Sequence, residues 1–322
     1  GCSGFVMAGG MMVVESWLNE RSTNETRGTV FSVYMTVNFI SITGGQFLVA
    51  AGDTAQDTLF MLASILFCMA VLPTALSAAA TPKPLTQVRL NLRQLFYFSP
   101  VAFIAAMLVG VVNGAFGTLA PVFGAKSGLP PLLIAAMMGL AIMAGALMQI
   151  PIGRVSDRTD RRYVLAGGAI GAGLAGILIA TFRPADPTTI LIMVAFYGAL
   201  TYPLYSLAVA HANDFASSGD FVAISGGLLM LYGIGTMIGP ALASLAMERF
   251  GPSALFTITA SAHLALAGHA IYRTMRRKPI PEGLRGTFAS VPATKALTPE
   301  TVALDPRAEE DDNRGGPEPI SS

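Results

Sequence analysis

Eight long stretches of this 322-residue chain contain no Asp, Glu, Lys or Arg, and a ninth, shorter one lies at the front. Each long stretch holds about 20 residues or more, and a helix needs about 20 apolar residues to cross roughly 30 Å of hydrocarbon. The stretches are residues 28–52, 58–82, 94–125, 127–153, 163–182, 187–213, 221–247 and 250–272, with 1–14 at the front. The pattern predicts a polytopic membrane protein.

The composition agrees with this interpretation. Hydrophobic residues make up 53% of the chain and charged residues 12%, whereas about a quarter of an average soluble domain is charged. Because lipid offers no hydrogen-bond partners, each spanning segment must satisfy its own backbone. Barrel strands would be about 10 residues long and alternate in polarity, and these stretches do neither. We therefore expect an all-α fold with nine transmembrane helices.

The placement of the basic residues orients the chain. With nine spans, one membrane face receives Arg21, Arg27, Lys83, Arg89, Arg93, Arg154, Arg158, Arg161, Arg162, Arg273, Arg276, Arg277 and Lys278. The opposite face receives only Lys126, Arg183 and Arg249. Basic residues concentrate on the cytoplasmic side of membrane proteins. This predicts a cytoplasmic C-terminus, and the polar, acidic tail 279–322 should be disordered there.

The loop between the stretches 127–153 and 163–182 carries the most specific motif. It reads Gly153-Arg154-Val155-Ser156-Asp157-Arg158-Thr159-Asp160-Arg161-Arg162. This resembles the loop signature of the major facilitator superfamily, G-x-L-[SA]-D-[RK]-x-G-[RK]-[RK], with Val155 in place of Leu and Asp160 in place of the second Gly. A generic basic loop would not require Gly, Asp and Arg at this spacing.

The resemblance implies a transporter fold of twelve helices in two halves, with the signature after the second helix of each half. If Asp157 marks the second copy, the nine stretches correspond to family helices four to twelve, and the chain is truncated at its N-terminus. The expected parts are residues 1–80 of the N-terminal half, a cytoplasmic linker 81–98, a six-helix C-terminal half 99–278 and the tail. A native nine-span protein is the alternative.

A narrower similarity concerns the segments around Glu15–Glu20, Arg27 and His211–Asp214. They resemble a bacterial branch of the superfamily whose members mostly lack an assigned substrate. This implies a bacterial inner-membrane protein that moves a small organic solute by alternating access. A non-transporting sensor or structural protein on a degenerate transporter fold remains the alternative.

The charged loops suggest a gate. We expect Asp157 to face the start of the stretch 28–52, around Arg27 to Val30, because a helix N-terminus stabilises a carboxylate. We expect Arg158, Arg161 or Arg162 to meet Glu20 or Asp214. Such contacts would exist only while the cytoplasmic side is closed and would bias one conformation. The alternative is that these charges, with Gly153, merely keep the loop in the cytoplasm.

Candidates for coupling and substrate binding are fewer. We expect no acid or base near the middle of any span; Glu15 and His211, near span ends, are the candidates for proton coupling. Polar side chains on cavity-facing helices are the candidates for substrate contacts, with interhelical hydrogen bonds as the alternative. They are Asn113, Tyr197, Tyr202, Tyr205, Asn38 and Gln149, and more weakly Gln46 and Tyr232.

The residues that other functional classes would require are not found in the sequence. A membrane-embedded enzyme would need a clustered nucleophile or metal set within a span, and the sequence shows none. His263 and His269, six residues apart, point to different faces of their helix and do not suggest a metal site. We expect no cofactor, no metal and no nucleic-acid partner. The expected partners of this monomer are a small-molecule substrate, the lipid bilayer and, as a hypothesis, protons.

Overall fold

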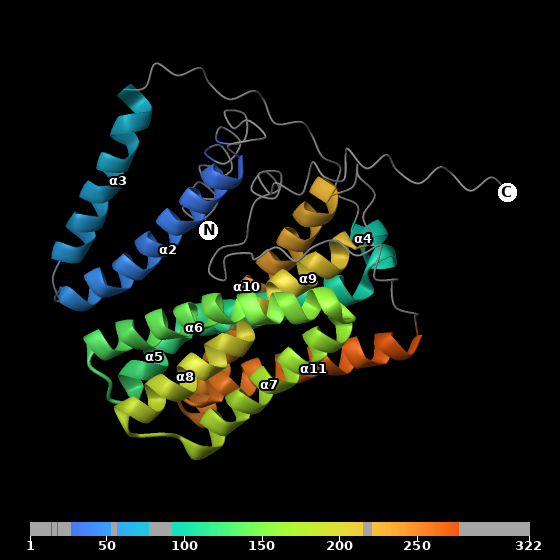
Figure 1. Ribbon diagram of the computed structural model, residues 1–322. Helices are drawn as coiled ribbons and strands as arrows, with labels where there is room; N and C mark the ends of the chain where they lie inside the picture. Colours follow the sequence, from blue (N-terminus) through green and yellow to red (C-terminus); the bar gives the residue numbers. More distant parts are fainter. Residues whose placement is uncertain are drawn as a thin grey trace.

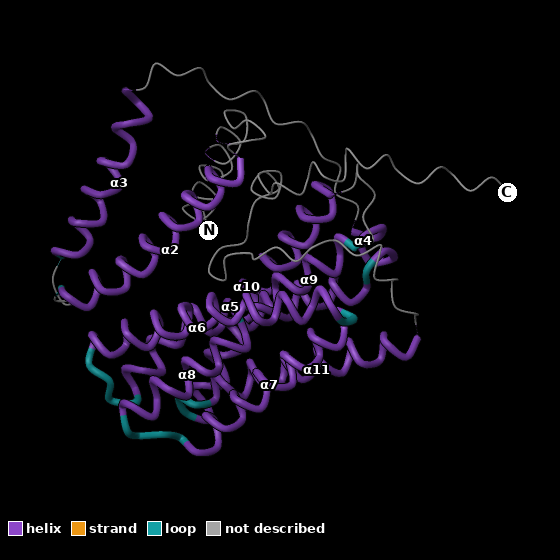
Figure 2. Tube along the Cα trace, viewed as in Figure 1, coloured by secondary structure: helices purple, strands orange, loops and turns teal. Residues whose placement is uncertain are grey.

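The computed structural model describes Val14, Leu18 and residues 27–52, 57–76, 92–214 and 221–276, and every regular element in these ranges is a helix (Figures 1 and 2). The helices are α2 (Arg27–Ala51), α3 (Thr58–Leu76), α4 (Leu92–Phe98), α5 (Pro100–Lys126), α6 (Pro131–Arg158), α7 (Arg161–Phe182), α8 (Pro187–Thr201), α9 (Pro203–Asn213), α10 (Phe221–Phe250) and α11 (Ala254–Arg276). The all-α prediction is confirmed over the described residues.

Within the described ranges, six helical segments are long and apolar enough to cross a membrane: α5, α6, α7, α8 with α9, α10 and α11. The apolar parts of α2 and α3 are shorter, Ile40–Val49 and Thr58–Pro73. The front stretch, residues 1–14, lies outside the described residues except for Val14. Six of the nine expected spans are therefore present as long apolar helices, and the count of nine is not established.

The six spans form one antiparallel bundle, here called the α5–α11 bundle, with α4 leading into α5 (Figure 1). Helices α5 and α10 pack closely, because small residues let the two backbones approach. A Cβ added at Gly114 of α5 would lie 2.5 Å from the main-chain oxygen of Thr236, and one added at Gly235 of α10 would meet the backbone of α5. Small residues at helix interfaces replace the hydrophobic driving force that lipid does not supply.

Short connections separate the spans, and capping side chains begin several of the helices. Ser99 accepts a hydrogen bond from the backbone N–H of Ala102 and is followed by Pro100 at the first helical position of α5. Asp186 caps α8 in the same way, accepting from the N–H of Thr189 at 2.8 Å. Capping side chains satisfy N–H groups that a helix start leaves unpaired.

The span predicted over residues 187–213 is broken into α8 and α9 at Tyr202 and Pro203. Proline has no N–H to donate and its ring crowds the preceding turn, which accounts for the break at this position. Hydrophobic side chains from every bundle helix fill two adjoining cores. One lies around Phe116, Phe123 and Phe256, and the other around Leu165, Leu204 and Leu228.

Because the helices alternate in direction, the turns gather at two ends of the bundle (Figure 1). The α6–α7 turn, the end of α9 and the end of α11 share one end. The α5–α6, α7–α8 and α10–α11 turns share the other. The structure thus brings the motif loop 153–162 to the same end of the bundle as Asp214 and Arg273.

Candidate functional site

The motif loop is a tight connection between α6 and α7. Helix α6 ends at Arg158, and Thr159 closes it by donating its hydroxyl to the carbonyl of Val155 at 2.7 Å. Asp160 then caps α7, its carboxylate accepting from the N–H of Arg162 at 3.0 Å. Asp160, which departs from the family pattern in which Gly stands, therefore has a defined local task.

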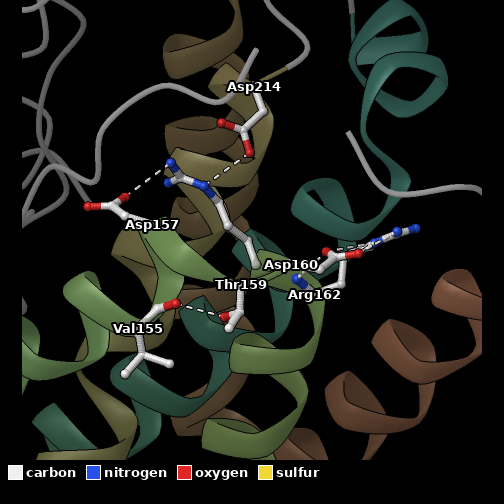
Figure 3. A network of polar contacts seen from close by, with 7 residues as sticks. Val155, Asp157, Thr159, Asp160, Arg162 and Asp214 are labelled. Atoms are coloured by element: carbon white, nitrogen blue, oxygen red, sulfur yellow. Dashed lines mark hydrogen bonds and ion pairs between the residues drawn. The ribbon is translucent and has the colours of Figure 1, made fainter. Parts of the chain in front are cut away.

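Arg161 lies at the centre of the site. Its side chain is 1% exposed, and its Nε lies 3.0 Å from Oδ2 of Asp214, whose side chain is 3% exposed. Its Nη2 lies 3.4 Å from Oδ1 of Asp157, one turn back on α6, whose side chain is 36% exposed. Figure 3 shows the carboxylates of Asp157 and Asp214 on either side of this guanidinium. One buried cation thus joins the end of α6, the start of α7 and the end of α9.

Arg162 turns to a different set of partners. Its guanidinium donates to both oxygens of the Asp160 carboxylate, at 3.0 Å from Nε to Oδ1 and at 2.6 Å from Nη2 to Oδ2. Its Nη1 donates to the main-chain oxygen of Arg273 in α11 at 3.3 Å. The last carbonyls of a helix lack intrahelical partners. Arg162 therefore ties the start of α7 to the last turn of α11.

The electrostatics of Asp160 follow from this geometry. Partial burial by itself would raise the pKa of Asp160, but hydrogen bonds from the Arg162 side chain and backbone, with the charges of Arg162 and His211, together lower it below the ordinary value. Hydrogen bonding and nearby positive charge favour the ionised form. The same influence shows that buried His211, near the end of α9, lies within electrostatic reach of the loop.

Comparison with known proteins supports the family that the loop motif indicated. The profile of the Major Facilitator Superfamily matches residues 1–185 and, in a second match, residues 102–306. The chain belongs to the major facilitator superfamily. Similar proteins include an uncharacterized MFS-type transporter, YcaD, of Escherichia fergusonii, 27% identical over 78% of this chain and 65% of its own length. Another of Yersinia enterocolitica is 26% identical over 87% of this chain and 71% of its own.

The chain thus spans about two thirds of the length of the curated relatives that it matches. No solved structure matches it. The relatives are named as transporters rather than enzymes, and their names assign no substrate. This confirms the narrower resemblance to facilitators of unassigned substrate. It also makes this chain an integral membrane protein of a transporter family.

The other residues proposed for the gate are only partly within the described residues. In the last turns of α6, Gly153 is buried and Arg158 is exposed. Arg27 is the first residue of α2, and Glu15 and Glu20 lie outside the described residues. Of the pairings expected from the sequence, Arg161 with Asp214 is present. Asp157 contacts Arg161, and its approach to the start of α2 stays a prediction.

Most of the candidate substrate residues lie in two clusters. Asn113 of α5 donates to the hydroxyl of Tyr232 of α10 at 3.2 Å, and the Tyr205 ring of α9 lies 4.7 Å from the Tyr232 ring between centroids. Tyr197 and Tyr202 instead lie in the aromatic core around Phe116. Asn38 donates to the Tyr34 carbonyl of its own helix at 2.9 Å, and Gln149 is buried on α6.

One expectation is wrong. We expected no acid or base near the middle of a span, yet His263 lies close to the middle of α11 and is 1% exposed. The residue stands well inside the uncharged stretch 250–272, which was defined by the absence of Asp, Glu, Lys and Arg only. We considered His263 only as a metal ligand, although its place in the stretch 250–272 already put it near the middle of a span.

Proposed function

We propose that this chain forms family helices four to twelve of a secondary transporter that moves a small organic solute across the bacterial inner membrane by alternating access. The supporting observation is the buried Arg161, held between Asp157 and Asp214 at the basic end of the bundle. A buried cation is stable only while its carboxylate partners stay in place. The arrangement of α6, α7 and α9 at this end is therefore tied to one set of ion pairs.

Asp157 is the part of this network suited to gating. Its side chain is 36% exposed, whereas Arg161 and Asp214 are enclosed. We propose that Arg161 fixes the position of Asp157 and that the carboxylate's outer side meets the start of α2 or Glu20 and Arg27 when the cytoplasmic side closes. Contacts made in only one conformation bias the equilibrium between conformations by their own free energy. The Arg161–Asp214 pair would persist in both conformations.

In this proposal residues 1–80 belong to the N-terminal half, 81–98 to a cytoplasmic linker and 99–278 to the C-terminal half, with the tail in the cytoplasm. Helix α4 falls within the linker, and its Leu95 packs into the bundle core. The basic residues at the α6–α7 end of the bundle support a cytoplasmic position for that end. The working unit is a monomer in the lipid bilayer.

For the substrate we propose the Asn113, Tyr205 and Tyr232 cluster. These side chains come from α5, α9 and α10, and the Oδ1 atom of Asn113 is buried without a hydrogen-bond partner among the described residues. An amide acceptor beside two phenol rings suits an uncharged or amphipathic solute that donates a hydrogen bond. Tyr197 and Tyr202 are not part of this proposal, since they pack in the aromatic core.

Proton coupling is the finer part of the proposal. His211 is buried near the end of α9, three positions before Asp214, and acts electrostatically on Asp160. Histidine changes charge between about pH 5 and 8, so a proton taken up here would alter the charge of the network in the physiological range.

The test is uptake by proteoliposomes of the full-length protein over a panel of uncharged and amphipathic solutes, with and without a pH gradient. We expect uptake of at least one solute, strong slowing by Asp157→Asn and normal uptake by Asp186→Asn, which alters a helix cap at the opposite end of the bundle. No uptake of any solute would favour a sensor or structural role. Uptake unchanged by Asp157→Asn would remove the proposed gate.

A further inference from the structure

The interior of the α5–α11 bundle contains a second polar cluster, formed by Tyr197 and Thr201 of α8 and His263 of α11. All are nearly fully enclosed, at 0%, 1% and 1% exposed. The Tyr197 ring meets the His263 ring edge-on, with centroids 5.8 Å apart. This cluster lies far along the spans from the loop network, since His263 is near the middle of α11 and Arg162 contacts its last turn.

The polar atoms of the cluster have no hydrogen-bond partners among the described residues. They are the hydroxyls of Tyr197 and Thr201 and both ring nitrogens of His263. The Tyr197 hydroxyl faces the hydroxyls of Thr201 and Thr259, and the His263 ring faces the backbone of Thr259, yet ordinary hydrogen-bond geometry is not reached in either case. The Thr259 hydroxyl itself donates to the Phe256 carbonyl at 3.2 Å. Buried polar groups that face one another without a direct hydrogen bond can be joined by a bridging water.

The energetics make a dry cluster costly. Each buried polar group without a partner costs about 1 to 3 kcal/mol relative to one that is paired. A neutral imidazole carries one donor and one acceptor, and hydroxyls supply both. A water molecule needs two to four polar partners to be held in a protein interior. The cluster offers that number from two helices, with donors and acceptors that match.

We propose that Tyr197, Thr201 and His263 form a binding site for an internal water molecule that bridges α8 and α11 near the middle of the membrane. Glycines of α7 line the same region: a Cβ at Gly173 would lie 3.5 Å from His263 Cβ, and one at Gly176 would lie 3.6 Å from the Tyr197 ring. The site lies directly before the Pro203 break, where the span changes from α8 to α9. It places a titratable side chain in contact with water inside a span.

Replacing the hydroxyl-bearing side chains tests the water site, because the stability of the protein should fall if the cluster holds water and should not fall if it is dry. Tyr197→Phe and Thr201→Val each remove one hydroxyl and keep the side-chain volume nearly constant. If a water bridges the cluster, each should lower the apparent melting temperature of the purified protein, by roughly 2 to 4 °C. If the cluster is dry, removing an unpaired hydroxyl should leave the melting temperature unchanged or raise it, and the proposal fails. Matched controls are Tyr272→Phe and Thr181→Val, which are exposed.

A spectroscopic measurement on the unaltered protein keeps the test independent of folding defects. The chain has 3 histidines, so ¹⁵N-histidine labelling gives few signals, and loss of one set in His263→Gln assigns the residue. We expect a hydrogen-bonded shift for at least one ring nitrogen of His263 and magnetisation transfer from the ring to water. Shifts of an unbonded ring without transfer to water overturn the site. Neither result depends on whether the protein transports a solute.

Discussion

Replacing Asp214 should destabilise the α5–α11 bundle far more than replacing Asp157, although both carboxylates contact the same guanidinium. Asp214 and Arg161 are 3% and 1% exposed and 3.0 Å apart. Removing one partner of a buried pair costs about 3 to 5 kcal/mol, because the other charge remains buried. In Asp214→Asn the amide oxygen and Asp157 still face Arg161, so we expect about 2 to 4 kcal/mol.

The Asp157 pair is weaker for two structural reasons. The separation is 3.4 Å, and the carboxylate is 36% exposed in an i,i+4 arrangement along the chain. Because water reaches the Asp157 carboxylate, we expect this pair to contribute about as much as exposed ion pairs do, about 0.2 to 1 kcal/mol. Asp157→Asn should therefore leave stability nearly unchanged while slowing transport strongly, if its task is gating. The two aspartates should thus show opposite profiles in stability and transport.

The assay is reversible unfolding of the purified protein in mixed detergent micelles, with Asp186→Asn as the control. A double variant, Arg161→Met with Asp214→Leu, completes the design, since apolar residues can replace a buried pair at little cost. It should recover most of the stability lost in Asp214→Asn. Equal losses for Asp157→Asn and Asp214→Asn would refute the reasoning, as would a coupling energy between Arg161 and Asp214 below about 0.5 kcal/mol in the double-mutant cycle.

Two further predictions concern neighbouring features. Asp160→Asn should lower stability near pH 7; because the pKa of Asp160 is depressed in the folded protein, the stabilisation is present above the ordinary aspartate range and lost as the pH falls through the folded value. Denaturation at pH 7 and below about pH 4 checks this, and an equal deficit at both would contradict it. Gly114→Ala should cost about 1 to 3 kcal/mol because its Cβ meets the Thr236 backbone. Gly117→Ala, with open space around it, should cost nothing or stabilise slightly; equal losses would contradict the close-packing argument.

Much of the fold was predictable because each spanning helix is specified locally. Six of the uncharged stretches correspond to α5 through α11. The stretch 187–213 is broken at Tyr202 and Pro203, and the other differences lie at the ends. The expected span 94–125 begins later, at Pro100, where Ser99 supplies a cap, and the expected span 250–272 extends to Arg276. Long basic side chains can end a span while their charge reaches the interface, so a charge-free window misses the last turn.

The site was predictable only in part. The motif identified the loop and named Arg158, Arg161 or Arg162 as the partner of Glu20 or Asp214, but it could not choose among them. Consecutive residues on a helix point in directions about 100° apart, so Arg161 faces α9 and Arg162 faces the end of α11. That choice depends on where α9 and α11 pack, which no local pattern records.

The sequence by itself determined that the chain is helical, that it belongs in a membrane, and which loop carries the family's charges, because these properties depend on apolar length and residue order along the chain. Only the tertiary structure decided that Arg161 is enclosed, that Tyr197 packs with His263 in the core, and that Asn113 meets Tyr232. These contacts join residues far apart in the sequence, and their energies depend on burial and direction, which arise only when the helices pack.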